Sequence, residues 1–233
     1  GNGSSEDIWG TLPTTPINTG EWFHIAITVN NIASPTVKGY INGVLEGSGT
    51  NAGSPVAITY DPSLFTIGGR ENTSGTLGYY WNGEIEQVRF YGSELSLTGI
   101  QDIYNNSKPG SLPPLKTSSD LTTTICNFPS GTTGTALYQF QGDADDSCTV
   151  GPYNGTFTNS AYETGKFGPE CASFNGSSSR VNTGYNIPGS LSGFSVSAWV
   201  KAASVKTQYI VGDMGTGGAA VDSMFYINIS SSN

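Results

Sequence analysis

Charge is scarce in this sequence. Asp, Glu, Lys and Arg make up 12% of the 233 residues, and the 18 acidic residues outnumber the 9 basic ones, giving a net charge of −9. Because phosphate contacts depend on Lys and Arg, this balance argues against a large nucleic-acid interface and disfavours binding to anionic membranes. The single histidine, His24, argues against a histidine-based metal site or catalytic triad, since both need partner residues.

Long apolar runs are also missing. No stretch of 18 apolar residues is present, and Gly1 does not begin a signal-peptide pattern. We therefore expect no membrane-inserted helix, and either a soluble protein or the mature part of a longer one. The start at Gly1 instead of Met favours the second alternative.

Cysteine is limited to three residues, Cys126, Cys148 and Cys171, which form neither a Cys-x-x-Cys metal motif nor a thiol active-site motif. Three pairings are open. A Cys148–Cys171 disulfide, with Cys126 free or paired elsewhere, would stabilise the fold by about 3 kcal/mol. The odd thiol could instead join another chain.

Glycine (32 residues), aromatic residues and many Ser, Thr and Asn residues favour short strands and tight turns, so the composition predicts an all-β protein. Residues 21–30 and 194–200 alternate like strands, and Asn42-Gly43 is typical of a two-residue hairpin turn. The alternation in residues 81–91 is imperfect. Residues 96–104 predict one short helical turn.

Residues 108–134 contain Pro109, Pro113, Pro114 and Pro129 among runs of Ser and Thr, without apolar periodicity. Such a segment cannot supply a central strand or a helix, so we expect an extended linker. It divides the chain into residues 1–107 and residues 135–233.

Each flanking segment resembles half of a laminin-G-like, concanavalin-A-like domain. Residues 1–107 carry Trp-Phe-His-Ile-Ala from Trp22, Gly-Tyr-Ile-Asn-Gly-Val from Gly39, Ile-Gly-Gly from Ile67 and Trp-Asn-Gly-Glu-Ile-Glu-Gln-Val-Arg-Phe-Tyr from Trp81, as in the family's second half. Residues 135–233 carry Gly-Lys-Phe-Gly from Gly165, Phe-Asn-Gly-Ser-Ser-Ser from Phe174 and Phe-Ser-Val-Ser-Ala-Trp-Val from Phe194, as in its first half. The resemblance implies an antiparallel jelly-roll β-sandwich.

The halves occur in reverse order, so neither segment alone should complete both sheets of a sandwich. Two situations give this order. The chain is one period of a tandem array cut inside a domain, or it is a circular permutant whose linker joins the natural ends. We favour the array because a linker of this length is typical between beads, a bead being one folded domain of the array. The halves then complete a sandwich within one chain or with neighbouring copies.

The resemblance also suggests a structural calcium ion. In the laminin-G-like family, an Asp of the acidic loop and the acid before the Val-Arg-aromatic strand can share one ion; here these positions are Asp146 and Glu86, with Asn154 nearby in sequence. Calcium prefers such carboxylate and amide oxygens. We expect Ca²⁺ as the only candidate cofactor.

Two further patterns concern sugars. Glu84 and Glu86 are two residues apart on a predicted strand and resemble the catalytic strand of jelly-roll glucanases, but Val88 and Arg89 stand where a third acid is required, so we expect no enzyme. Trp81, Tyr79 and Tyr80 cluster before the Glu84 strand, and Trp81 and Tyr80 form a candidate aromatic platform for a glycan; core packing is the alternative.

Together these features predict a non-catalytic structural or adhesive bead of a fibre, extracellular or virion-associated, whose partners are copies of itself or neighbouring repeats. A lectin-like module that binds cell-surface glycans is the alternative, and a glycoside hydrolase is the least favoured one.

Overall fold

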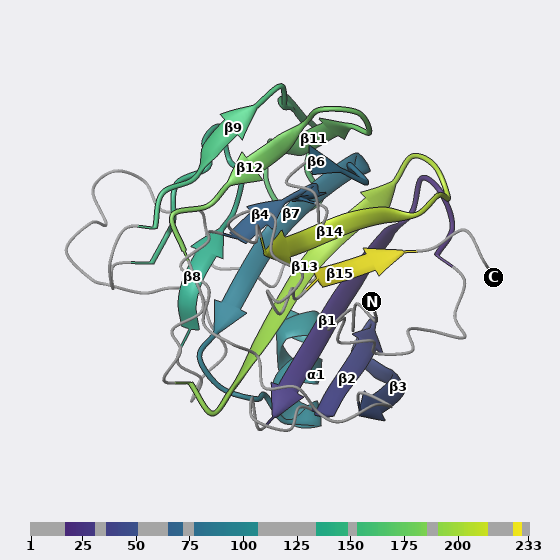
Figure 1. Cartoon of the computed structure of the whole chain (residues 1–233), viewed down its shortest axis with the longest axis vertical. Helices are drawn as coiled ribbons and strands as arrows, with labels where there is room; N and C mark the ends of the chain where they lie inside the picture. The colour runs from purple at the N-terminus through teal and green to yellow at the C-terminus, as the bar shows by residue number, and fades with distance from the viewer. Residues whose placement is uncertain are drawn as a thin grey trace, which may run out of the picture.

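The computed structural model describes residues 17–30, 36–50, 65–71, 77–106, 134–148, 153–185, 191–213 and 226–229. Most strands belong to two antiparallel sheets, and β14 and β15 pass in front of β13 and β1 in Figure 1. The fold is an all-β jelly-roll sandwich with one short helix, as the sequence predicts.

The larger sheet, called sheet A, has eight strands in the order β10-β11-β7-β13-β1-β2-β3, with β8 also paired to β7. Its strands are β1 (Trp22–Asn30), β2 (Thr36–Ile41), β3 (Val44–Thr50), β7 (Asn82–Tyr91), β8 (Gly134–Tyr138), β10 (Ala161–Glu163), β11 (Cys171–Asn175) and β13 (Gly193–Ala202).

The smaller sheet, called sheet B, has five strands in the order β15-β14-β4-β12-β9. They are β4 (Phe65–Ile67), β9 (Thr156–Thr158), β12 (Arg180–Asn182), β14 (Gln208–Asp213) and β15 (Tyr226–Ile229). A separate pair joins β5 (Arg70–Glu71) to β6 (Leu77–Gly78).

Both sheets contain strands from either side of the predicted linker. In sheet A, β7 lies between β11 and β13, and β1 pairs with β13 from Trp22 to Asn30. In sheet B, β4 lies between β14 and β12. Residues 108–133 of the linker lie outside the described residues, and Gly134, the last residue assigned to it, begins β8. The central strands of each segment therefore find their neighbours in the other segment.

The core lies between the sheets, and strand alternation explains which residues enter it. Phe23, Ile25, Ile27 and Val29 of β1 point inward, as do Phe194, Val196, Ala198 and Val200 of β13; all belong to one buried cluster. Each fully buried large apolar side chain contributes about 1.5–3 kcal/mol. The other face of these strands, called the outer face of sheet A, carries the alternate residues.

A β-bulge in β7 explains its imperfect alternation. Gln87 has φ +56°, and the pairing with β13 shifts between Ser197 and Trp199. The extra residue moves Val88 to the core face together with Ile85. Consequently Glu86 and Arg89, three positions apart, both lie on the outer face.

The hairpin predicted at Asn42-Gly43 joins β2 and β3, with φ +50° and +79° at the two turn residues. The Asn42 side-chain oxygen also accepts the His24 amide at 3.0 Å, which attaches the turn to β1. The predicted helical turn is α1 (Leu97–Asn106).

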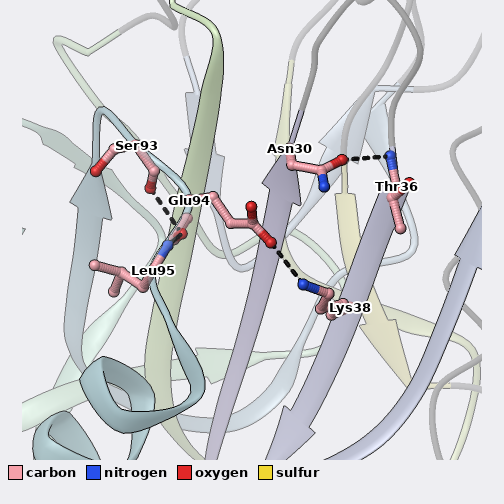
Figure 2. Close-up of polar contacts among 7 residues, drawn as sticks. Asn30, Thr36, Lys38, Ser93, Glu94 and Leu95 are labelled. Carbon is pink, nitrogen blue, oxygen red and sulfur yellow. Dashed lines mark hydrogen bonds and ion pairs between the residues drawn. The ribbon is translucent and has the colours of Figure 1, made fainter.

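Helix α1 packs on the outer face of sheet A. Its Ile100 and Ile103 form a second buried cluster with Ala26, Tyr40, Tyr91 and Leu95. The segment before it is held to the sheet as well: Figure 2 shows Glu94 paired with Lys38 of β2, at 2.8 Å. No helix among the described residues has the length and apolar character needed to span a bilayer.

Candidate functional site

The Glu86 carboxylate is buried on the outer face of sheet A and holds the loop between β10 and β11. It accepts hydrogen bonds from the Lys166 amide at 2.7 Å, from the Phe167 amide at 3.3 Å and from Gln141 Nε2 at 3.1 Å. Burial raises the pKa of Glu86 to about 7, against the opposing effect of these donors. The Gly-Lys-Phe-Gly motif is thus the loop whose backbone this carboxylate binds.

Glu84, the other acid of the proposed glucanase pair, forms an ion pair with Lys201 at 3.2 Å. Its partner Glu86 has no exposed surface, and backbone amides engage both of its oxygens. A retaining or inverting glycosidase needs two carboxyl groups that reach the sugar and a water molecule. The arrangement does not offer such a pair.

Asp146 organises the acidic loop that follows β8. Its Oδ1 accepts the amides of Leu137 and Cys148, each at 2.9 Å, and its Oδ2 accepts that of Tyr153 at 3.4 Å. Asn154 is close, as the sequence suggests, because its Oδ1 accepts the Asp146 amide at 3.2 Å. Burial raises the pKa of Asp146 above its usual value.

The structure brings two of the three predicted calcium ligands into contact with each other. Asp146 and Asn154 are together, but Glu86 belongs to a different set of contacts, formed by Lys166, Phe167 and Gln141. The oxygens that calcium requires already accept N–H donors. Within the described parts of the chain, no group of three or more His, Cys, Asp and Glu side chains is arranged to hold a metal ion.

Trp81 is not a glycan platform, which corrects the prediction. Its side chain has 0% exposure and belongs to the core. The backbone explains this position: the Trp81 amide donates to Gly68 O at 2.9 Å and its carbonyl accepts the Gly176 amide at 2.8 Å, which fixes the residue between two turns. Tyr80 is half-buried, and its ring lies over the backbone of Gly69.

The exposed ring of this region is that of Tyr79, the third member of the predicted aromatic cluster. Tyr79 is 51% exposed, has φ +54° and packs its ring 5.2 Å from that of Tyr209. A left-handed backbone is uncommon for a bulky residue and is associated with functional sites. No sequence signal distinguishes Tyr79 from Tyr80, because the backbone angle depends on the tertiary structure.

The Cys148–Cys171 disulfide is wrong. Cys148 is disulfide-bonded, but Cys171 is a free, buried thiol. Its Sγ contacts the Thr164 carbonyl at 3.6 Å, so it faces the turn between β10 and β11 instead of the loop of Cys148. Burial raises the pKa of Cys171 to about 12, which keeps it protonated and unreactive. Cys126 lies outside the described residues.

His24 lies on the outer face of sheet A with 0% exposure. Its ring contacts those of Trp199, at 5.4 Å between centroids, and Tyr104, at 6.0 Å. Burial, together with the charge of Arg89, lowers the pKa of His24 to about 3. The imidazole is therefore neutral at physiological pH and is enclosed by aromatic rings.

Comparison with known families gives one match. Residues 1–101 match a laminin G family model described as the Concanavalin A-like lectin/glucanases superfamily. Comparisons with curated proteins and with solved structures return no match. The matched residues include the motifs from Trp22 to Tyr91, and their strands β1, β4 and β7 take central places in the two sheets.

Proposed function

Because this chain carries a laminin-G-like domain of the concanavalin A-like superfamily, a fold of carbohydrate-binding and structural modules, we propose that it is a non-catalytic structural or adhesive bead. The bead belongs to an extracellular or virion-associated fibre, and its partners are copies of itself or neighbouring repeats. The family match supports the coarse class, and the strand order supports the bead.

The strand order is the observation on which this proposal rests. β7 pairs with β11 and β13, and β4 pairs with β12 and β14. In both cases the central strand precedes residues 108–134 and its two neighbours follow them. Two segments that complete each other in this way suit a repeated chain, because the junction between repeats then lies inside a bead.

Protease cleavage between Lys108 and Lys116 tests this dependence. We expect the two fragments to elute together from a gel-filtration column under native conditions, and to separate only in denaturant. Fragments that separate without denaturant would show that each half is stable alone, and the bead proposal would then fail.

The contacts of Glu84 and Glu86 support the proposal that the bead is not a glycoside hydrolase, because neither carboxylate is free to act on a sugar. Glu84 is neutralised by Lys201, and Glu86 binds the backbone of Lys166 and Phe167. Turnover of a sugar polymer that is lost in Glu86→Gln, while the variant keeps its fold, would contradict this part of the proposal.

Self-association through the edge of sheet A would join beads. β3 is the last strand of that sheet, and it begins with two exposed apolar side chains, Val44 (59%) and Leu45 (47%). An edge strand of this kind pairs readily with another chain. We expect Leu45→Lys to reduce concentration-dependent association in analytical ultracentrifugation, because lysine blocks edge pairing.

Val205→Lys is the matched control, since Val205 is similarly exposed (52%) but lies in the loop between β13 and β14. Equal loss of association in both variants would indicate a general charge effect and contradict a role for the β3 edge.

Tyr79 favours a second candidate function, a lectin-like module. Its half-exposed ring is braced by Tyr209, whose amide also donates to the Tyr79 carbonyl at 2.9 Å, so a sugar ring could stack on a rigid surface. On a glycan array, Tyr79→Ala should abolish binding and Tyr80→Phe should retain it. Binding that survives in Tyr79→Ala would exclude this platform.

A further inference from the structure

Several polar atoms are buried on the outer face of sheet A without a hydrogen-bond partner among the described residues. They are both ring nitrogens of His24, Thr28 Oγ1, Arg89 Nε, Ser197 Oγ and Trp199 Nε1. None of the five side chains is more than 2% exposed. Buried polar groups in native proteins nearly always have partners, so this concentration on one face needs an explanation.

The strand register brings these residues together. Arg89 of β7 is opposite Ser197 of β13, which is opposite Ala26 of β1. His24 is opposite Trp199, one step along the same face. Opposite Cβ atoms lie roughly 5 Å apart and diagonal ones about 7–8 Å apart, so Ser197 lies within side-chain reach of the other groups. Ala26, opposite Ser197, is itself buried in the cluster with Ile100 and Ile103 of helix α1, so the patch lies under the helix.

Arg89 gives the patch a positive charge. Two of its guanidinium nitrogens donate to Gln87, to the backbone oxygen at 3.3 Å and to Oε1 at 2.9 Å, and neither acceptor carries a charge. No ion pair to Arg89 occurs in the described part of the chain. The charge of the nearby acid, Glu86, acts on Arg89 and raises its pKa against the effect of burial, but the Lys166 and Phe167 amides engage both Glu86 oxygens, so it forms no ion pair with Arg89.

The chemistry of the free groups indicates what they bind. Arg89 Nε and Trp199 Nε1 are donors only, and the hydroxyls of Ser197 and Thr28 are able to donate. The neutral His24 imidazole adds one more N–H. Donors around a buried cation suit an anion, because water would satisfy the hydrogen bonds but would add no negative charge beside the Arg89 guanidinium.

We propose that the outer face of sheet A contains an internal site for a small monovalent anion of the halide class, bound chiefly by Arg89 Nε–H and Ser197 O–H. His24 and Trp199, which face each other across β1 and β13, supply further N–H donors. One negative charge balances Arg89, whereas a phosphate or sulfate dianion would leave excess charge in a buried place. The bound anion neutralises the layer between sheet A and helix α1 and so stabilises the bead.

Thermal unfolding of the intact chain in different sodium salts tests this site. We compare bromide with gluconate at equal ionic strength, since gluconate is too large to enter a buried site. For a dissociation constant of about 10 mM, bromide should raise Tm by roughly 2–5 °C between about 5 and 100 mM, with saturation. Anomalous diffraction from crystals in bromide should place one ion in contact with Arg89 and Ser197.

Two serines of the same strand and face form a matched pair of variants. Ser197→Ala removes a proposed ligand and should abolish the bromide-dependent rise in Tm. Ser195→Ala should lower Tm equally in both salts and keep the rise, because Ser195 Oγ is already bonded to the Leu95 amide and the Ser93 carbonyl, each at 2.9 Å. Figure 2 shows Ser93 and Leu95 on the segment between β7 and α1.

Identical Tm values in bromide and gluconate would mean that water or side-chain rearrangement satisfies these groups, and would overturn the proposal. A bromide-dependent rise in Tm of full size in Ser197→Ala would mean that an adventitious ion only, bound at the surface, causes the rise. This result would also overturn the proposal.

Discussion

His24→Phe and Glu86→Gln should reveal two pH dependences of folding stability that oppose each other in the parent chain. His24 has a pKa of about 3 in the folded protein and an ordinary value of 6.5. Between these values the unfolded chain binds more protons, so stability is lost as the pH falls below 6.5. From pH 8 to pH 5 this loss amounts to about 2 kcal/mol.

Glu86 acts in the other direction. Its pKa is about 7 in the folded protein and ordinarily 4.5, so the folded state binds more protons between these values. Stability therefore rises as the pH falls from 7 to 4.5, and from pH 8 to pH 5 the gain is about 2.5 kcal/mol. In the parent chain the two effects therefore oppose each other over this range.

Each variant removes one of the two titrating groups and keeps the other: His24→Phe keeps the Glu86 carboxyl group, and Glu86→Gln keeps the His24 imidazole. Phe is close to the imidazole in size and fits between Trp199 and Tyr104, whose rings already contact it. Gln keeps one acceptor oxygen for the amides of the loop at Lys166, although it weakens those charge-assisted bonds. The absolute stability of Glu86→Gln will fall, so the measurement of interest is the slope with pH.

Urea unfolding followed by the fluorescence of the four tryptophans gives the free energy at pH 5, 6, 7 and 8. Sodium gluconate sets the ionic strength, so that halide does not contribute. Relative to the parent, His24→Phe should gain about 2 kcal/mol and Glu86→Gln should lose about 2.5 kcal/mol on going from pH 8 to pH 5. Profiles of both variants that run parallel to the parent within about 0.5 kcal/mol would refute this account of the two buried groups.

Three further results are expected. Trp81→Ala should lower the free energy of unfolding by about 3–5 kcal/mol in urea titrations, whereas Tyr79→Ala should lower it by less than about 1.5 kcal/mol; similar losses would contradict the burial difference. Dithiothreitol should lower Tm because Cys148 is disulfide-bonded, and Cys171→Ala should leave that decrease unchanged. EDTA should leave Tm unchanged, because amides engage the oxygens of Asp146; a decrease reversed by calcium would restore the metal site predicted from sequence.

Local patterns were sufficient for most of the fold. Alternation in residues 21–30 and 194–200 predicted β1 and β13, and Asn42-Gly43 predicted the hairpin between β2 and β3. These features depend on neighbouring residues alone, since alternation decides which side chains can face a core and a positive φ decides which residues can close a tight turn. The order of motifs also predicted the jelly roll.

The contacts of the candidate site residues could not be predicted from local patterns, because they involve residues far apart in the sequence. The family resemblance puts Glu86 at the position of a calcium ligand, but the loop at Lys166 approaches from 80 positions away and supplies N–H donors to it. Trp81 was selected for its type, and only the two turns at Gly68 and Gly176 bury it.

The sequence by itself determined the class of fold, the main strands and the low charge of the chain. Only the tertiary structure decided which polar side chains lie next to each other on the outer face of sheet A. The bulge at Gln87 turns Glu86 and Arg89 to the same face, and the pairing of β7 with β13 places Arg89 beside Ser197. Such placements arise from register between distant strands, and register is set by the packing of a whole face and not by any short stretch of residues.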